Sequence, residues 1–494
     1  MIGRRAFLGG AGLAAIAVVG FDPLGARWVT EAEAATRPSF AGVPELDGEL
    51  VVDEAARKAV ATDLGNIAHH EPSAVLRPRS ARDIATMIRF CREHRIPVSP
   101  RGQAHTTLGQ GLSAGLVIEN RHLSRIHTLG PRVAEVDAGI HWMDLAKAAF
   151  ARSPRLTPPV LTGYTGLTVG GTLSVGGVGG IVGGLRTGLQ VDHVRELEVV
   201  TGAGDIERCS RHHKSDLFHA VLGGLGQCGV ITKAAIDLVP AKERARTYVL
   251  GYDDTAAFVR DLRTLIERPG VDHVYAEFVA PGSSPTYKVH ATVFYDPPGK
   301  PHDASVVGDL SARPEIQDTG YLDYVFSIDA TIDELRETVN WDRLVKPWFD
   351  VWVPGSAIED YLVDIMATLT PRDIGPYGAG LIYPQRRAHA RNPYPRLPEP
   401  DGSAWAFVLD INTVSSTTDP GPGFVEEMLR RNDRLIARTR ERHGGVLYPI
   451  GSVRYTARDW RQHYGEMWPA FRAAKRRYDP GNVLTPGPGI FGDG

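Results

Sequence analysis

Apolar and polar residues alternate along the first half of the chain with two periods, one typical of helices and one of strands. In segment 80–94 apolar residues recur three or four positions apart, at Ile84, Met87, Ile88 and Cys91, and a short apolar run follows at 96–98. This pattern predicts a helix that leads into a strand. Further on, short β-rich runs alternate with glycine-dense loops and one helix; the runs are 115–119, 133–137 and 197–201, and the helix is 142–150.

The pattern changes near residue 240. Longer helical stretches then alternate with apolar strands; the helices include 255–267 and 423–443, and the strands include 274–279, 289–294 and 405–411. We therefore predict an α+β fold with two domains, in which residues 35–240 form the first domain and residues 241–445 an α/β second domain, a sheet covered by helices. Residues 446–494 are too few for a domain of their own and are expected to return to the first one.

The N-terminus has the features of an export signal. Arg4 and Arg5 precede a small-residue, apolar stretch at 9–20, and Ala32-Glu33-Ala34 offers a small-x-small cleavage site. This order predicts a twin-arginine signal over residues 1–34 and an exported mature protein. A membrane anchor is the poorer interpretation, because the apolar stretch is shorter than the roughly 20 residues that a span needs.

Composition excludes several classes of protein. The 494 residues are 43% hydrophobic and 23% charged with a formal net charge of -3, which is ordinary for a globular protein and offers no basic surface for nucleic acid. Three scattered cysteines without a Cys-x-x-Cys pair predict no zinc site and leave one disulfide open. We expect no metal ion, no nucleic acid partner and no membrane span in the mature protein.

A turn of small residues follows the predicted strand at 96–98. Its sequence, residues 100–106, is Pro-Arg-Gly-Gln-Ala-His-Thr. Small residues let backbone N–H groups approach an anion closely, as a pyrophosphate-binding loop requires. A lone histidine after such a turn is more often a structural residue than a ligand or an attachment site.

Two further glycine-dense stretches lie at 167–184 and 222–232. Valine, leucine and isoleucine punctuate the glycines, so the first loop is expected to pack against something flat, such as an isoalloxazine ring. The spacing fits neither the Rossmann nor the Walker pattern, because the order of strand, Gly-x-Gly-x-x-Gly and helix is missing.

In this order, these stretches resemble the FAD domain of the vanillyl-alcohol oxidase and p-cresol methylhydroxylase (PCMH-type) superfamily, and cytokinin dehydrogenases most of all. The resemblance extends over residues 63–491 and includes the motifs at 346–354, 380–384, 460–468, 478–480 and 484–487. It implies a two-domain, FAD-binding PCMH-type fold in which the second domain caps the flavin and binds the substrate.

The resemblance also implies which residues bind the cofactor. His105 takes the place of the histidine that bonds the flavin 8α-methyl, and a second flavin bond is not expected because residues 160–188 contain no cysteine. The residues at FAD-contacting positions are Arg101, Gly102, Gln103, Ala104, His105, Thr106, Gln110, Thr168, Gly170, Gly171, Ser174, Val178, Ile231 and Thr485.

One departure from the family concerns the catalytic base. Cytokinin dehydrogenases carry an aspartate four residues before Leu-Thr-Val-Gly-Gly, where it accepts the proton of the substrate amine, and this chain has Gly163 there. Glycine cannot accept a proton, so activity on cytokinins is expected to be absent or very slow. Tyr164 and Glu277 are the candidate replacements, although a tyrosine is a poor base unless its pKa of about 10 is lowered, and Glu277 could equally be a solvent-facing strand residue.

The resulting hypothesis is an FAD-dependent oxidase or dehydrogenase that moves a hydride from a C–H next to nitrogen or oxygen to flavin N5 and is reoxidised by oxygen or another acceptor. Trp348, Asp350, Trp352 and Tyr383 are the candidate contacts for a flat or aromatic substrate, or else part of the core. An alcohol or sugar oxidase, a cytokinin dehydrogenase with a relocated base and a non-catalytic flavin-containing binding or electron-transfer protein stay open. So do the substrate, the electron acceptor and the oligomeric state.

Overall fold

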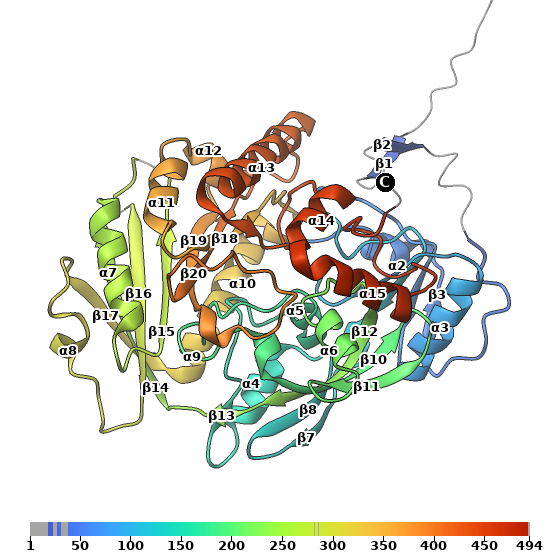
Figure 1. Ribbon diagram of the computed structural model, residues 1–494, viewed down its shortest axis with the longest axis horizontal. Coiled ribbons are helices and arrows are strands. Elements are labelled where there is room, and N and C mark those ends of the chain that lie inside the picture. Colours follow the sequence, from blue (N-terminus) through green and yellow to red (C-terminus); the bar gives the residue numbers. More distant parts are fainter. Residues whose placement is uncertain (1–17, 23–26, 31–37, 281, 285, 493–494) are drawn as a thin grey trace, which may run out of the picture.

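The computed structural model describes residues 18–22, 27–30, 38–280, 282–284 and 286–492. The arginine pair and the cleavage site of the predicted signal lie outside these residues, and the described part of that region is a hairpin of β1 (Val18–Asp22) and β2 (Arg27–Thr30). The rest of the chain forms two layered halves that lie side by side (Figure 1).

The first half contains two main sheets, besides the two-stranded pair of β9 (Leu156–Thr157) and β13 (Val239–Pro240). The smaller has the order β3 (Glu49–Val51), β4 (Ala74–Arg77), β6 (Leu116–Glu119) and β5 (Val98–Arg101), in which the last three strands run parallel. The larger is antiparallel, with the order β11 (Ile206–Ser210), β10 (Val194–Thr201), β12 (Gly229–Asp237), β8 (Val133–Asp137) and β7 (Ile126–Leu129). The helices of this half are α2 (Glu54–Ala59), α3 (Ala81–Glu93), α4 (Trp142–Phe150), α5 (Val169–Leu173) and α6 (Ser215–Val221).

The predicted helix at 80–94 is confirmed as α3, and its start is fixed by local chemistry. Ser80 and Asp83 form a capping box, in which each side chain accepts a hydrogen bond from the backbone of the other. The apolar face buries Ile84, Met87 and Ile88 in the core of the small sheet. Because β5 follows directly, the polar residues after it emerge at the edge of that sheet.

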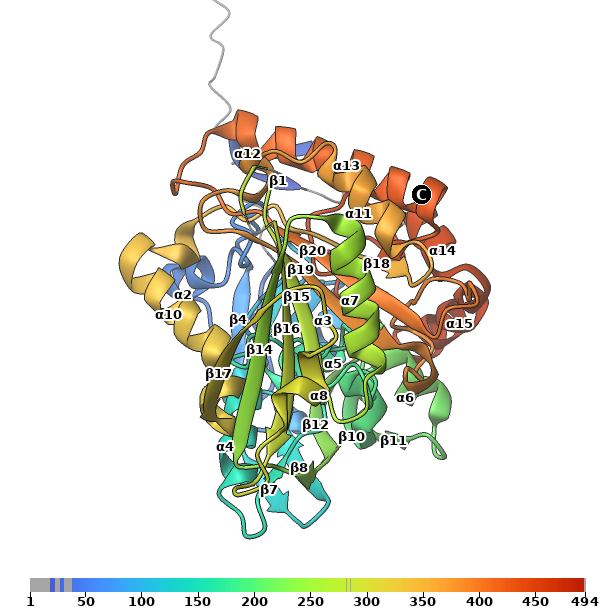
Figure 2. The same cartoon turned by 90° about the vertical axis from the view of Figure 1, so that its left-hand side faces the viewer.

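The second half is built on one antiparallel sheet. Its order is β17 (Pro314–Gly320), β14 (Arg244–Tyr252), β16 (Tyr287–Tyr295), β15 (His273–Phe278), β19 (Ala379–Arg386), β20 (Trp405–Asn412), β18 (Phe349–Pro354) and β21 (Val446–Leu447). One face is covered by α7 (Thr255–Glu267), α11 (Ile358–Met366) and α13 (Pro422–His443), as Figure 2 shows. The other helices of this half are α8 (Asp303–Val307), α9 (Tyr321–Val325), α10 (Ser327–Val339) and α12 (Pro371–Ile374). We call this sheet the cap sheet.

The C-terminal segment lies against the first half. α14 (Ala457–Tyr464) and α15 (Trp468–Tyr478) follow the cap sheet, α15 contacts α6, and Leu484 forms a parallel bridge with Val98 of β5. A buried ion pair of 2.7 Å between Lys475 and Asp479 stabilises this return.

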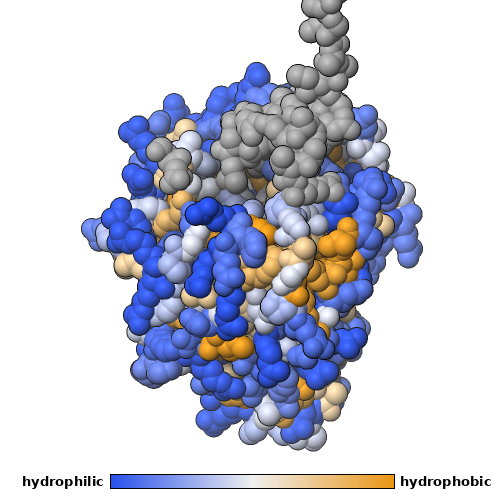
Figure 3. Space-filling view, turned by 90° about the vertical axis from the view of Figure 1, so that its right-hand side faces the viewer, coloured by the Kyte–Doolittle hydropathy of each residue, from blue (hydrophilic) through white to orange (hydrophobic). Residues whose placement is uncertain are grey.

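The described residues give no indication of a membrane span or a metal site. The face in Figure 3 is mostly hydrophilic with small apolar patches between the polar residues. Within the described ranges, no helix has the length and apolar character of a membrane span, and no group of three or more His, Cys, Asp or Glu side chains is arranged to hold a metal ion. Cys91, Cys209 and Cys228 are buried free thiols.

Candidate active site

A cavity of about 680 Å³ lies between the two halves. It is lined by the loop after β5, by the glycine-dense loop around α5, by the start of β12 and by the inner face of the cap sheet. Every residue that the sequence places at an FAD-contacting position lines it, although these residues are spread from 101 to 485 along the chain. The fold therefore brings all of them to one site.

The loop after β5 leaves its backbone free to bind an anion. Within the described part of the chain, the amides of residues 102–106 donate to no protein acceptor. The Arg101 guanidinium donates to the carbonyl oxygens of Val60 at 3.1 Å and Thr62 at 2.7 Å, so it fixes the start of the loop. Exposed N–H groups on a fixed backbone are suited to phosphate oxygens.

Asp63 holds the far end of this loop. Its carboxylate accepts hydrogen bonds from the backbone amides of Gly109 at 2.7 Å and Gly65 at 3.0 Å, and from the Thr106 hydroxyl at 3.2 Å. Burial raises the pKa of Asp63 to about 6, and the three donors oppose that shift. The carboxylate thus ties residues 63–65 to residues 106–109.

Close approach explains the small residues of the cofactor loops. A Cβ on Gly102 would collide with the Thr168 hydroxyl, and one on Gly170 would stand 2.8 Å from the Ala138 side chain. Ala104 has a φ of +49°, in the left-handed region that costs a residue with a Cβ about 1–2 kcal/mol. The contact at Gly102 packs the loop after β5 against the start of α5, and both segments line the cavity.

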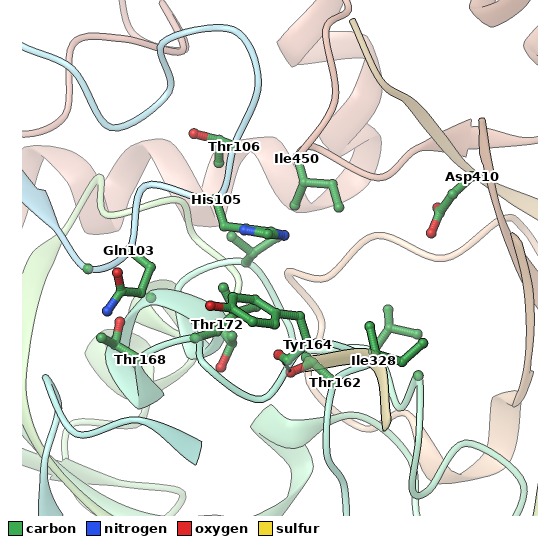
Figure 4. A pocket seen from close by; sticks show the side chains of 18 of the residues that line it. Gln103, His105, Thr106, Thr162, Tyr164, Thr168, Thr172, Ile328, Asp410 and Ile450 are labelled. Carbon is green, nitrogen blue, oxygen red and sulfur yellow. Dashed lines mark hydrogen bonds between the residues drawn. The ribbon is translucent and has the colours of Figure 1, made fainter. Parts of the chain in front are cut away.

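His105 is a partly buried ionisable group of the loop after β5. Its ring stacks on Tyr164 with centroids 5.2 Å apart and meets the edge of Trp348 at 5.4 Å. Burial, together with the positive charges of Lys346 and Arg336, lowers the pKa of His105 to about 3. The imidazole is therefore neutral at pH 7 and points into the cavity above Tyr164 (Figure 4).

The cap sheet supplies the opposite wall. Side chains at directly opposed positions of an antiparallel sheet lie on the same face, which aligns Glu277 with Leu381 and Leu381 with Asp410. The neighbouring row contains Tyr275 and Tyr383, whose rings are 6.5 Å apart. All five side chains line the cavity, and Figure 4 shows Asp410 on the side opposite Gln103 and Thr168.

The structure separates the predicted substrate residues into two groups. Trp348 and Tyr383 line the cavity, whereas Asp350 and Trp352 are not among its lining residues. Asp350 is directly opposed to Asp410 on the neighbouring strand, on the side away from the cavity. Trp352 packs against Tyr448 with ring centroids 6.0 Å apart. This geometry therefore does not support Asp350 and Trp352 as direct substrate contacts.

Both candidate bases line the cavity, and both are already paired. Glu277 Oε1 lies 3.5 Å from His290 Nε2, and the Tyr164 hydroxyl accepts a hydrogen bond of 3.2 Å from Arg336. Burial acts to raise the pKa of Glu277, but His290 and Lys288 outweigh it and the net shift is downward. A carboxylate with a lowered pKa is a weaker base.

Asp410, Asn412 and Tyr448 were missed by the sequence reasoning. The first two belong to the predicted strand at 405–411 or its end, and their signal was a pair of polar residues in an otherwise apolar strand. Tyr448 follows β21 and lines the cavity as well. Whether these side chains face the cavity depends on the register of the strands, which the pattern of apolar and polar residues does not specify.

Gly163 lies at the wall where the two halves meet. Its φ is outside the left-handed region, and a Cβ built on it would contact only the Tyr383 hydroxyl, at 3.7 Å. The position can therefore hold a side chain without strain, and the absence of a carboxylate there is not imposed by the backbone.

These features fit an FAD. The free amides of residues 102–106 would bind the pyrophosphate, the glycine-dense loop with Thr168, Gly170 and Gly171 would pack against the ring, and the neutral His105 would meet its edge. Gln110, Ser174, Val178, Ile231 and Thr485 complete the same wall.

Comparisons with known proteins agree with this site. Residues 72–210 match the family model of an FAD binding domain, and residues 304–491 match "Cytokinin dehydrogenase 1, FAD and cytokinin binding". The fold resembles the crystal structure of 6-hydroxy-D-nicotine oxidase from Arthrobacter nicotinovorans, with a TM-score of 0.68 at 21% identity over 90% of this chain and 98% of that one.

Two relatives in sequence cover nearly the whole chain. An uncharacterized oxidoreductase, ORF5 in the fasciation locus of Rhodococcoides fascians, is 34% identical over 90% of this chain and 99% of its own length. Cytokinin dehydrogenase 7 of Oryza sativa subsp. japonica is 32% identical over 90% of this chain and 91% of its own. With its PCMH-type fold and both matched domains, the chain belongs to the cytokinin dehydrogenase family of FAD-dependent oxidoreductases.

Proposed function

We propose that this protein oxidises a C–H bond next to a nitrogen or oxygen atom of a small, flat substrate, with FAD bonded covalently through His105. Bound FAD accepts the hydride and passes its electrons to oxygen or another acceptor. The observation that carries the proposal is one continuous cavity with cofactor loops on one side and an aromatic and acidic cap sheet on the other.

The state of His105 supports the covalent bond. A neutral imidazole has a free lone pair on one ring nitrogen, which is what attack on the flavin 8α carbon requires. The pKa of about 3 keeps that lone pair available over the whole physiological pH range. Tyr164 and Trp348 hold the ring from two sides and restrict its orientation.

The cap sheet supports a flat substrate with polar hydrogens. Tyr275, Tyr383 and Trp348 offer ring surfaces, while Glu277 and Asp410 offer acceptors. We propose further that the protein reaches the cell exterior through its twin-arginine signal, which carries folded proteins and suits a cofactor inserted in the cytoplasm.

A panel of amines, alcohols and sugars tests the proposed function. Each compound is added to the purified yellow protein without oxygen, and bleaching of the flavin absorbance is followed; peroxide is then measured with oxygen present. Bleaching by an amine supports the main proposal, and bleaching only by alcohols or sugars supports the alternative that Gly163 favours. A protein that holds flavin but is bleached by none of them would be a binding or electron-transfer protein instead.

A further inference from the structure

Two buried carboxyl groups face each other in the cap sheet. Asp350 of β18 and Asp410 of β20 are directly opposed, and their residues are 0% and 6% exposed. No Lys, Arg or His side chain forms an ion pair with either of them within the described residues, and both Asp350 oxygens and Asp410 Oδ1 have no hydrogen-bond donor there. Two opposed carboxyls that are buried without a counter-ion cannot both be charged, so they share a proton.

The environment holds one proton on the pair near neutral pH, mainly on Asp350, so that Asp410 can accept a second. Burial and the charge of Asp410 raise the pKa of Asp350 well above its ordinary value. Burial raises the pKa of Asp410 to about 7, and a hydrogen bond from Asp350 opposes the shift. The pair interacts with the phenols of Tyr383 and Tyr448, and burial raises the pKa of both phenols, so they stay neutral; Glu277 acts on Tyr383 as well.

Only one member of the pair reaches the cavity. Asp410 lines it and Asp350 does not. Tyr383 is a neighbour of Asp410 on the same face of the sheet, because it is opposed to Val408, and the Tyr383 hydroxyl is 3.7 Å from a Cβ built on Gly163. The pair therefore approaches, from the cap side, the space where cytokinin dehydrogenases carry their aspartate.

We propose that Asp410 is the proton acceptor of this enzyme and that Asp350 is its positioning partner; the proposal rests on the proposed function. For an amine substrate, the C–H bond breaks and its electron pair leaves as hydride to the flavin, while the nitrogen lone pair forms a C=N bond. The N–H bond breaks, its electron pair stays on nitrogen, and the proton goes to Asp410. The substrate loses two electrons and becomes an imine, and Asp410 becomes a neutral acid.

The charges along the cavity favour an amine over an anionic substrate. Glu277, Asp323 and Asp410 line it, whereas Arg101 is the one Lys or Arg among the lining residues and is bound to two carbonyl oxygens. An anionic substrate would find no free cation here, while an amine would find acceptors. This predicts that benzylamine binds more tightly than benzyl alcohol.

The first test compares Asp410→Asn with Asp360→Asn, a matched control on an exposed residue of α11 that does not line the cavity. The rate of anaerobic flavin reduction by benzylamine is measured against pH. Wild type should show a rate that rises with pH around 7, Asp410→Asn should be slower by about 10²–10⁴-fold without that rise, and Asp360→Asn should keep both. An Asp410→Asn protein with full flavin content, wild-type rate and wild-type pH profile would overturn the proposal.

Variants of Asp350 separate a positioning role from a structural one. Asp350→Asn retains a hydrogen-bond donor to Asp410 and should keep the rate, whereas Asp350→Leu removes the donor and should move the midpoint of the pH profile upward. Equal profiles for the two variants would contradict the role assigned to Asp350.

A second readout is independent of turnover. The carbonyl-stretch band of a protonated carboxyl is followed by infrared spectroscopy of the holoprotein, and it should disappear as pH rises through about 7 in wild type and in Asp360→Asn but not in Asp410→Asn. If benzylamine bleaches no flavin, the proposed function fails for this amine, and the infrared titration still decides the pair: a wild-type protein without a titrating band between about pH 5 and 9 overturns it.

Discussion

Replacing Gly163 by aspartate should restore the proton acceptor that cytokinin dehydrogenases carry at this position. The structure allows the change, because the backbone is outside the left-handed region and the new Cβ meets only the Tyr383 hydroxyl, at 3.7 Å. Loss of glycine freedom in the unfolded chain contributes about 0.4–1 kcal/mol of stability, which offsets part of the cost of burying a carboxyl. The phenol of Tyr383 is placed to donate to it.

The expected gain follows from general-base catalysis, which contributes roughly 10²–10⁴-fold. Anaerobic flavin reduction by an isoprenoid cytokinin is compared in wild type, Gly163→Asp and Gly163→Asn, which has the same shape but cannot accept a proton. Gly163→Asp should be the fastest, and wild type, in which Asp410 acts only from the cap side, should be very slow on this substrate. Equal rates for Asp and Asn, with full flavin content in both, would refute the role of this position; a wild-type rate of about 1–1000 per second would show that cytokinin oxidation was never lost.

Three further predictions concern other parts of the chain. Ala104→Gly should raise the free energy of unfolding by up to about 1 kcal/mol, since it relieves a left-handed φ of +49°; urea denaturation that shows a loss instead would argue against strain there. Arg4→Lys with Arg5→Lys should strand the protein in the cytoplasm, and unchanged export in a fractionation assay would exclude the twin-arginine route. The pKa of Asp410 is raised to about 7 in the folded state, so the folded protein binds an extra proton between about pH 4 and 7. The free energy of unfolding should therefore fall by roughly 2–4 kcal/mol as the pH rises through that window. Asp410→Asn should flatten this pH dependence, and a curve as steep as that of wild type would contradict the assignment.

Local patterns were sufficient to predict the elements with strong periodicity. Helices α4 and α7 and strand β8 have the predicted bounds, because a helical or alternating apolar pattern coincides there with clear turn residues. The cofactor loops were predictable for a different reason. A backbone that approaches another segment closely requires small residues, as at Gly102 and Gly170, and such residues can be recognised in the sequence.

The acidic wall could not be predicted in the same way. Asp350 was identified beside aromatic residues, but which carboxyl faces the cavity depends on the register of β18 against β20. That register is set by packing between strands more than fifty positions apart in the chain, and it puts Asp410 in front. Trp352 shows the same limit, because its aromatic character suits a ligand and a core equally, and only packing against Tyr448 distinguishes them.

The covalent bond between His105 and the flavin is the central claim, and acid denaturation tests it most directly. The purified protein is precipitated with acid, washed and separated on a denaturing gel, with His105→Ala as the matched control. We predict flavin fluorescence on the wild-type polypeptide and none on the His105→Ala polypeptide, which should fold but hold FAD only loosely. Flavin released quantitatively into the supernatant of the wild-type protein would contradict the claim.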